Sequence, residues 1–212
     1  MDLHTILLMV PAILIALTFH EFAHGYVAYR LGDPTAKMMG RLTLNPLAHL
    51  DPIGTLMIFL VRFGWAKPVP VDPRNLRNPK RDMLWIAAAG PLMNMGLALI
   101  SGLLIRVLWA AGLATPHAGG SGNVLFTMLY LSLYINLALA IFNILPLPPL
   151  DGSKILAGIL PNRYGPQLAI LESRGPFILM GIIVFGMITN IHVLGFFIRP
   201  WVNFFSWVFA GI

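Results

Sequence analysis

The stretch HEFAH at residues 20–24 places two histidines four positions apart, with a glutamate directly after the first. Residues at positions i and i+4 share one face of a helix, so His20 and His24 can bind the same metal ion. Neutral imidazole suits zinc, and a catalytic zinc site combines three protein ligands with a water molecule. Glu21 lies beside the pair, where it can act as base toward that water. The stretch therefore predicts a zinc site with a catalytic base.

A third ligand is expected at Asp151, in the stretch NILPLPPLDG. Pro146, Pro148 and Pro149 interrupt an apolar helix there, and unwound backbone at membrane depth is tolerated only around a cavity or within packed protein. Gly152 lets the chain turn. The other acidic residues and histidines fall mostly in expected loops or at helix ends. One zinc ion, one bound hydroxide and the Asp151 carboxylate together form a neutral centre, which suits surroundings of low dielectric constant.

The composition indicates a membrane protein. Of 212 residues, 58% are hydrophobic and only 10% are charged, and the mean hydropathy is +0.79. Soluble domains carry about 25% charged residues. The chain has no cysteine, which excludes disulfides, thiolate zinc ligands and a cysteine nucleophile. The net charge of +6 comes from basic residues in short loops, so it reports membrane topology and not nucleic-acid binding.

The apolar segments predict a single all-α domain over 1–212, a polytopic bundle of about five to six transmembrane helices. A short helix is expected after the proline run, at 153–160. The long helices are expected at 5–29, 83–111, 124–145, 177–189 and 193–209.

Residues 37–73 break this pattern. The stretches GRLTLNP and GWAKPVPV are typical of strands, and PIGTLMIFLV between them is too short to cross a membrane. We expect a membrane-re-entrant β element here, on the cytoplasmic side. An ordinary span over 52–63 is the alternative, and it is disfavoured because one basic flank would then lie outside.

The loops predict the orientation. The segments 112–123 and 190–192 contain no lysine or arginine and are expected outside, whereas nine of the fourteen basic residues lie within 30–81. His24 precedes Arg30 by six residues, about 9 Å along a helix. We therefore expect a multi-pass protein of a bacterial plasma membrane, with its metal site in the cytoplasmic half of the bilayer.

These motifs resemble the site-2 protease family of intramembrane zinc metalloproteases, peptidase family M50. The resemblance rests on HEFAH, on AAAGPLMN at 87–94 and on FNILPLPPLDG at 142–152, and GRLTLNPLAHLDPIGTL and GWAKPVPV extend it over most of the chain. It implies that His20, His24 and Asp151 bind zinc and that Glu21 is the catalytic base. It also implies a re-entrant β element that aligns the substrate. The chain would be a compact member, without the PDZ or CBS domain of some relatives.

The resemblance further implies that Asn143, eight residues before Asp151, holds the substrate backbone. A buried amide facing zinc also suits an oxyanion on physical grounds. Contact between helices is the alternative role for Asn143, and it is the role we expect for Asn94 and Asn136.

The implied activity is hydrolysis of peptide bonds within or near transmembrane segments of membrane-protein substrates. The expected partners are such a substrate and the lipid bilayer; the oligomeric state is left open. We expect the extended substrate backbone to add to a strand edge formed by Gly40, Arg41, Leu42, Thr43 and Leu44. A metal transporter using the same ligands is the rival interpretation, as is a non-catalytic protein that binds helices. Neither needs Glu21 as a base.

Overall fold

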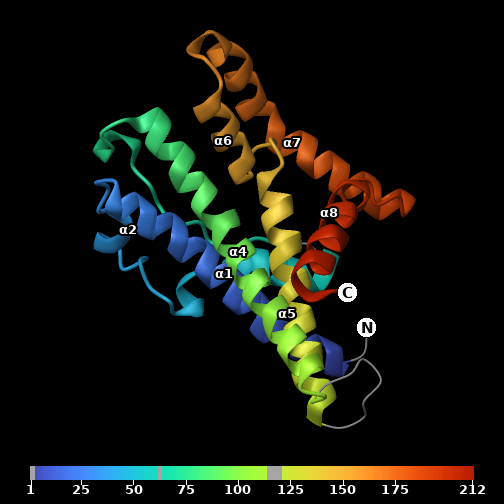
Figure 1. Cartoon of the computed structure of the whole chain (residues 1–212). Coiled ribbons are helices and arrows are strands. Elements are labelled where there is room, and N and C mark those ends of the chain that lie inside the picture. The colour runs from blue at the N-terminus through green and yellow to red at the C-terminus, as the bar shows by residue number, and fades with distance from the viewer. Residues whose placement is uncertain (1–2, 62–63, 114–120) are drawn as a thin grey trace.

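The structure is a computed structural model that describes residues 3–61, 64–113 and 121–212 (Figure 1). Its helices in chain order are α1 (Leu3–Arg30), α2 (Thr35–Met38), α3 (Pro52–Val61), α4 (Pro79–Ala110), α5 (Ser121–Ile144), α6 (Asp151–Ile159), α7 (Gly165–Thr189) and α8 (Val193–Ala210). Three short 3-10 turns join them, at Pro46–Ala48, Pro73–Asn75 and Asn162–Tyr164.

Five of these helices, α1, α4, α5, α7 and α8, are long and apolar enough to cross a membrane. This confirms the predicted all-α, multi-pass architecture. The segment 114–120, most of the loop that we expected outside, falls beyond the described residues. The other three helices are short, and α3 has ten residues, about half the length that a span requires.

The core of the bundle lies between α4, α5 and α8. Ile105, Leu133, Leu137 and Val202 are buried there, at 0–1% exposure. Gly102 lets α8 come close, because a methyl group at this position would lie 2.7 Å from Phe209. Helix α1 packs against α4 and α5, whereas α7 contacts only α6, α8 and the 162–164 turn among the described elements (Figure 1). Helices α4 and α5 therefore lie at the centre of the bundle, with α1 packed against both.

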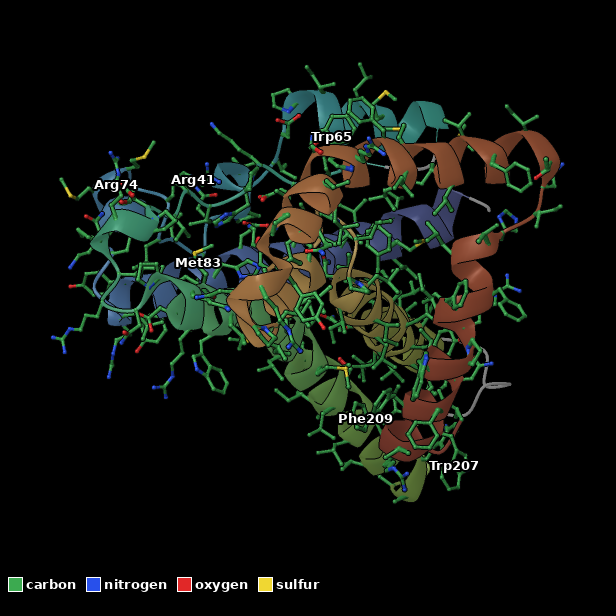
Figure 2. The ribbon with its side chains drawn as sticks, turned by 90° about the horizontal axis from the view of Figure 1, so that it is seen from above. Arg41, Trp65, Arg74, Met83, Trp207 and Phe209 are labelled. Carbon is green, nitrogen blue, oxygen red and sulfur yellow. The ribbon has the colours of Figure 1, made fainter. Side chains whose placement is uncertain are left out.

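The prediction of a re-entrant β element is wrong in its β part. The described residues contain no strand, and the only pairing within 37–73 is one antiparallel bridge between Leu50 and Ala66. The backbone N–H of Lys67 donates to His49 O at 2.9 Å, but Pro68 and Pro70 have no N–H to continue a ladder. Residues 40–44 form a bend. In Figure 2, the teal helix α3 near Trp65 lies to one side of the bundle.

Helix α7 also begins earlier than predicted, at Gly165 and not near 177. Here the helix continues through Pro176, and Gly175 packs against Pro148, where an added methyl group would lie 2.5 Å away. Helix α7 thus abuts the proline turn that precedes Asp151.

Asp33 connects the irregular segment 64–75 to the end of α1 through hydrogen bonds. Its buried carboxylate accepts hydrogen bonds from Asp72 N at 2.8 Å, Asn75 Nδ2 at 2.8 Å and Thr35 N at 3.1 Å. Burial acts to raise the pKa of Asp33, but the hydrogen bonds from Thr35, Asn75 and Asp72 outweigh it and lower the pKa. The Asp33 carboxylate stays ionised, so it keeps accepting these hydrogen bonds at neutral pH.

We predict that residues 52–63 do not cross the membrane, because α3 is too short to span it. The test is cysteine substitution at Lys37 and Arg74, which flank the segment, followed by labelling with an impermeant thiol reagent in intact cells. Both side chains should label alike, and the native chain gives no background because it has no cysteine. Labelling of one position but not the other from outside would show that the segment spans.

Candidate metal centre

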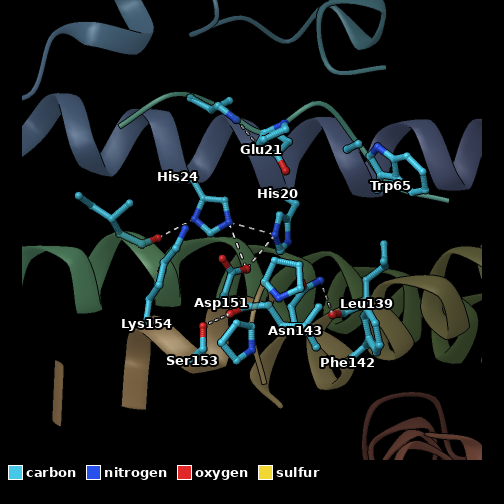
Figure 3. A pocket seen from close by; sticks show the side chains of 18 of the residues that line it. His20, Glu21, His24, Trp65, Leu139, Phe142, Asn143, Asp151, Ser153 and Lys154 are labelled. Carbon is cyan, nitrogen blue, oxygen red and sulfur yellow. Dashed lines mark hydrogen bonds and ion pairs between the residues drawn. The ribbon is translucent and has the colours of Figure 1, made fainter. Parts of the chain in front are cut away.

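Three ligand atoms from α1 and α6 converge at one point (Figure 3). His20 and His24 lie one turn apart on α1, with their Nε2 atoms 3.0 Å from each other. Asp151, the first residue of α6, brings Oδ2 to 3.1 Å from His20 Nε2 and 3.2 Å from His24 Nε2. The structure thus brings together the three residues that the sequence predicted as ligands.

Two glycines make this approach possible. A methyl group added at Gly90, on the facing side of α4, would lie 2.5 Å from His24 Nε2 and 2.6 Å from His20 Nε2. One added at Gly152 would overlap the backbone of Ile144 and Leu145 at the end of α5. The broken helix can therefore fold back tightly enough to aim Asp151 at the histidines, and α4 leaves space beside the rings.

The hydrogen bonds of the two imidazoles determine which ring nitrogen carries the proton. His24 Nδ1 lies 2.6 Å from the carbonyl oxygen of Ile86, which can only accept, so Nδ1 is the donor. His20 Nδ1 lies 2.6 Å from Asn94 Oδ1, and is likewise the donor. When the rings are neutral, both Nε2 atoms therefore present bare lone pairs to the ligand cluster.

This geometry fits a metal cation. Two lone pairs and a carboxylate oxygen face one another at 3.0–3.2 Å, and Asp151 Oδ2 receives no hydrogen bond from the described residues. The histidines are only 6% and 9% exposed, so little water screens the repulsion between these atoms. Zinc bonds of about 2.0–2.2 Å at tetrahedral angles put ligand atoms about 3.3–3.6 Å apart, close to the separations seen here.

Glu21 lies beside the ligands and is held by backbone. Its Oε2 accepts a hydrogen bond from the N–H of Val69 at 2.8 Å, and the residue is 9% exposed. Gly25, one turn farther along α1, lets Val69 come this close, because a methyl group there would lie 3.1 Å from the valine side chain. No described hydrogen bond engages the second oxygen, Oε1.

A cavity of about 650 Å³ lies over these groups. Glu21, the three ligands and Asn143 line it, together with residues 64–66, 68, 69 and 71, the proline turn and part of α7. Asn143 Nδ2 donates to Leu139 O at 3.0 Å within α5, and Figure 3 shows the side chain next to Asp151. The five residues from Gly40 to Leu44 are not among the lining residues. Of the two segments predicted to be strands, GWAKPVPV therefore lines the cavity and GRLTLNP does not contribute residues 40–44.

Sequence reasoning missed the support that Asn94, Gly90 and Val69 give to the site. We expected Asn94 to serve only in contact between helices, yet it accepts the hydrogen bond from His20. Gly90 and Asn94 are four apart in AAAGPLMN and so share one face of α4. A small residue and an amide on one apolar face are a recognisable pattern, but only tertiary structure shows which group they face.

The chain is similar in sequence to known proteins. A family model described as Peptidase family M50 matches residues 117–182. The Bacillus subtilis protein named "Putative zinc metalloprotease YwhC" is 42% identical over 167 residues, which are 79% of this chain and 75% of that protein. "Putative zinc metalloprotease Rip2" of Mycobacterium tuberculosis is 30% identical over 68% of this chain and 53% of its own.

A more distant relative is "Zinc metalloprotease MJ0392" of Methanocaldococcus jannaschii, 24% identical over 82% of this chain and 41% of its own. No solved structure matches the chain significantly. The likenesses, together with five membrane-length helices, define an intramembrane zinc metalloprotease. The chain belongs to peptidase family M50, the site-2 protease family, and its metal is Zn²⁺.

We predict that Gly90→Ala loses most of its bound zinc, because the added methyl group would lie against both Nε2 atoms. Zinc per purified chain is the measurement. Gly96→Ala is the matched control: it lies on the same helix and its added methyl group would contact nothing within 4 Å. Full zinc content in a folded Gly90→Ala protein would contradict the position of the metal site.

Proposed function

We propose that peptide hydrolysis takes place in this cavity, with His20, His24 and Asp151 as the zinc ligands and Glu21 as the catalytic base. The convergence of His20 Nε2, His24 Nε2 and Asp151 Oδ2 to within 3.0–3.2 Å of one another is the observation that carries the proposal. Zinc bound there supplies a Lewis acid for the scissile carbonyl and makes nucleophilic water available at neutral pH. The HEFAH and LDG motifs thus supply complementary parts of one centre.

Glu21 moves the proton. Val69 N–H holds Oε2, which leaves Oε1 to take the proton of the attacking water. The same oxygen then passes the proton to the leaving amine of the cleaved peptide bond. Because the carboxylate is buried and held at one oxygen, it needs little rearrangement between these two steps.

The substrate is a transmembrane segment of another membrane protein. Its helix must unwind locally, because helical hydrogen bonds shield the carbonyl that is attacked. The cavity offers an amide at Asn143 that can bind a peptide carbonyl or an oxyanion. This role requires Asn143 to exchange its present hydrogen bond to Leu139 O for one to the substrate.

The site lies in the cytoplasmic half of a bacterial plasma membrane. His24 is six residues from the end of α1 at Arg30, and basic side chains follow that end. Figure 2 shows two of them, Arg41 and Arg74, at the same end of the molecule. The positive-inside rule assigns this end to the cytoplasm. A metal transporter, the rival function, is not favoured by the likeness to zinc metalloproteases.

We predict that Glu21→Gln abolishes cleavage of a model transmembrane substrate and keeps one zinc per chain. The amide cannot take the proton, but its carbonyl oxygen can still accept from Val69 N–H. His20→Ala and Asp151→Ala should instead lose zinc and activity together. Near-normal turnover by Glu21→Gln would rule out the glutamate as base and favour a transport function.

Substrate binding by Asn143 and substrate binding by residues 40–44 are tested with separate variants. Asn143→Ala should keep its zinc and lower kcat/KM by about 100-fold, the cost of losing one donor to an oxyanion.

Thr43→Pro removes one backbone N–H from the bend at 40–44, and a sharp loss of cleavage in a zinc-loaded protein would indicate that this segment binds substrate. Unchanged cleavage would remove that segment from the substrate site.

A further inference from the structure

A chain of buried amides leads away from the metal centre into the interface between α4 and α5. Asn94 and Asn136 are both 0% exposed. Asn94 Oδ1 accepts from His20 Nδ1, and its Nδ2 donates to Asn136 Oδ1 at 2.8 Å and to Ala16 O at 3.1 Å. Asn136 Nδ2 donates to Ser132 O at 2.9 Å. The chain thus runs from a proposed ligand to the helical backbone of α5.

We propose that Asn136 is a positioning residue for zinc binding, although it lies two hydrogen bonds from the ligand. It acts by fixing the orientation of the Asn94 amide, and that orientation fixes which nitrogen of His20 carries the proton. The inference rests on the proposed function, because it takes His20 Nε2 as a zinc ligand.

The orientation of Asn94 matters because the two ends of an amide have opposite hydrogen-bonding character. With its oxygen toward His20, the ring must donate from Nδ1, which leaves Nε2 bare for the metal. If the amide were flipped, its NH₂ group would face Nδ1. The neutral ring would then accept at Nδ1 and carry its hydrogen on Nε2, where a hydrogen excludes the metal.

Two acceptors prevent this flip. In the flipped amide, Oδ1 would face Ala16 O and Asn136 Oδ1, so two hydrogen bonds would become two contacts between oxygen atoms. Asn136 cannot reverse its own amide to compensate, because its Nδ2 is engaged by the backbone carbonyl of Ser132. The backbone of α5 thereby selects the state of His20 through neutral groups alone, without placing another charge in the membrane.

His24 has no such dependence. Its Nδ1 donates directly to the backbone carbonyl of Ile86, which offers no alternative orientation. Changes at Asn136 therefore act on the His20 half of the site only. Removing an outer partner of a metal-binding histidine weakens metal binding by about 10- to 100-fold.

The experiment measures the zinc dissociation constant of the purified, folded protein by competition with a chelator, and the thermal midpoint of the metal-free protein. Asn136→Leu keeps the side-chain volume and removes the acceptor. We expect zinc to bind about tenfold more weakly than in the wild type. Ser101→Ala is the control, since it removes a hydrogen bond to Ser132 in the same helix interface, at 2.9 Å, without contact to Asn94. It should leave the dissociation constant unchanged.

A purely structural role would lower the thermal midpoint of both variants and leave both zinc dissociation constants unchanged, which would overturn the inference. A double-mutant cycle adds the decisive comparison. If Asn136 acts through Asn94, Asn136→Leu has no further effect on zinc binding once Asn94→Leu is present, whereas additive losses would overturn the relay. A His20→Ala variant that binds zinc as tightly as the wild type does would instead refute the proposed ligand set.

Discussion

The repulsion among three lone-pair donors in a membrane interior is the constraint on which the site depends. His20 Nε2, His24 Nε2 and Asp151 Oδ2 lie within 3.0–3.2 Å of one another, and neutral imidazoles that donate from Nδ1 put no hydrogen between them. In water such a cluster would be solvated, but these residues are largely buried. A bound cation relieves the repulsion, and in its absence the surrounding fold must hold the ligands together. Gly90 and Gly152 allow the close approach, and the hydrogen bonds of Asn94 and Ile86 direct both imidazoles.

Charge balance connects the site to its surroundings. One Zn²⁺ ion, the Asp151 carboxylate and the Glu21 carboxylate together sum to zero. In the proposed reaction, transfer of a proton from water to Glu21 would move charge within the site and leave that sum unchanged, which suits a region of low dielectric constant. The Val69 N–H stabilises the glutamate without adding a formal charge. Lys154 and Glu172 line the cavity as well, and their opposite formal charges cancel, whereas most other lysines and arginines lie between the end of α1 and the start of α4.

The sequence was sufficient to predict those features that depend on local rules. The five membrane-length helices follow from apolar length, and the meeting of His20 and His24 follows from the helical period. The prediction of a β element was wrong because a β-strand requires a partner strand, which sequence alone does not identify. In the structure, the N–H groups of Lys67 and Val69 go to His49 O and to Glu21, and not to a second strand. The role of Asn94 was also out of reach, since the sequence places an amide on α4 but does not reveal which helix it faces.

The unequal support of the two histidines follows from where α4 carries its polar groups. At Ile86, a backbone carbonyl of α4 points toward His24, so no particular side chain is required there. One turn of α1 farther from Arg30, no such carbonyl takes this role for His20, and the Asn94 side chain supplies the acceptor. An amide can present either end, so it needs partners that a carbonyl does not need. Those partners, Ala16 O and Asn136, come from α1 and α5. The metal centre consequently requires the packing of α1, α4 and α5 as a unit, in addition to the turn that delivers Asp151.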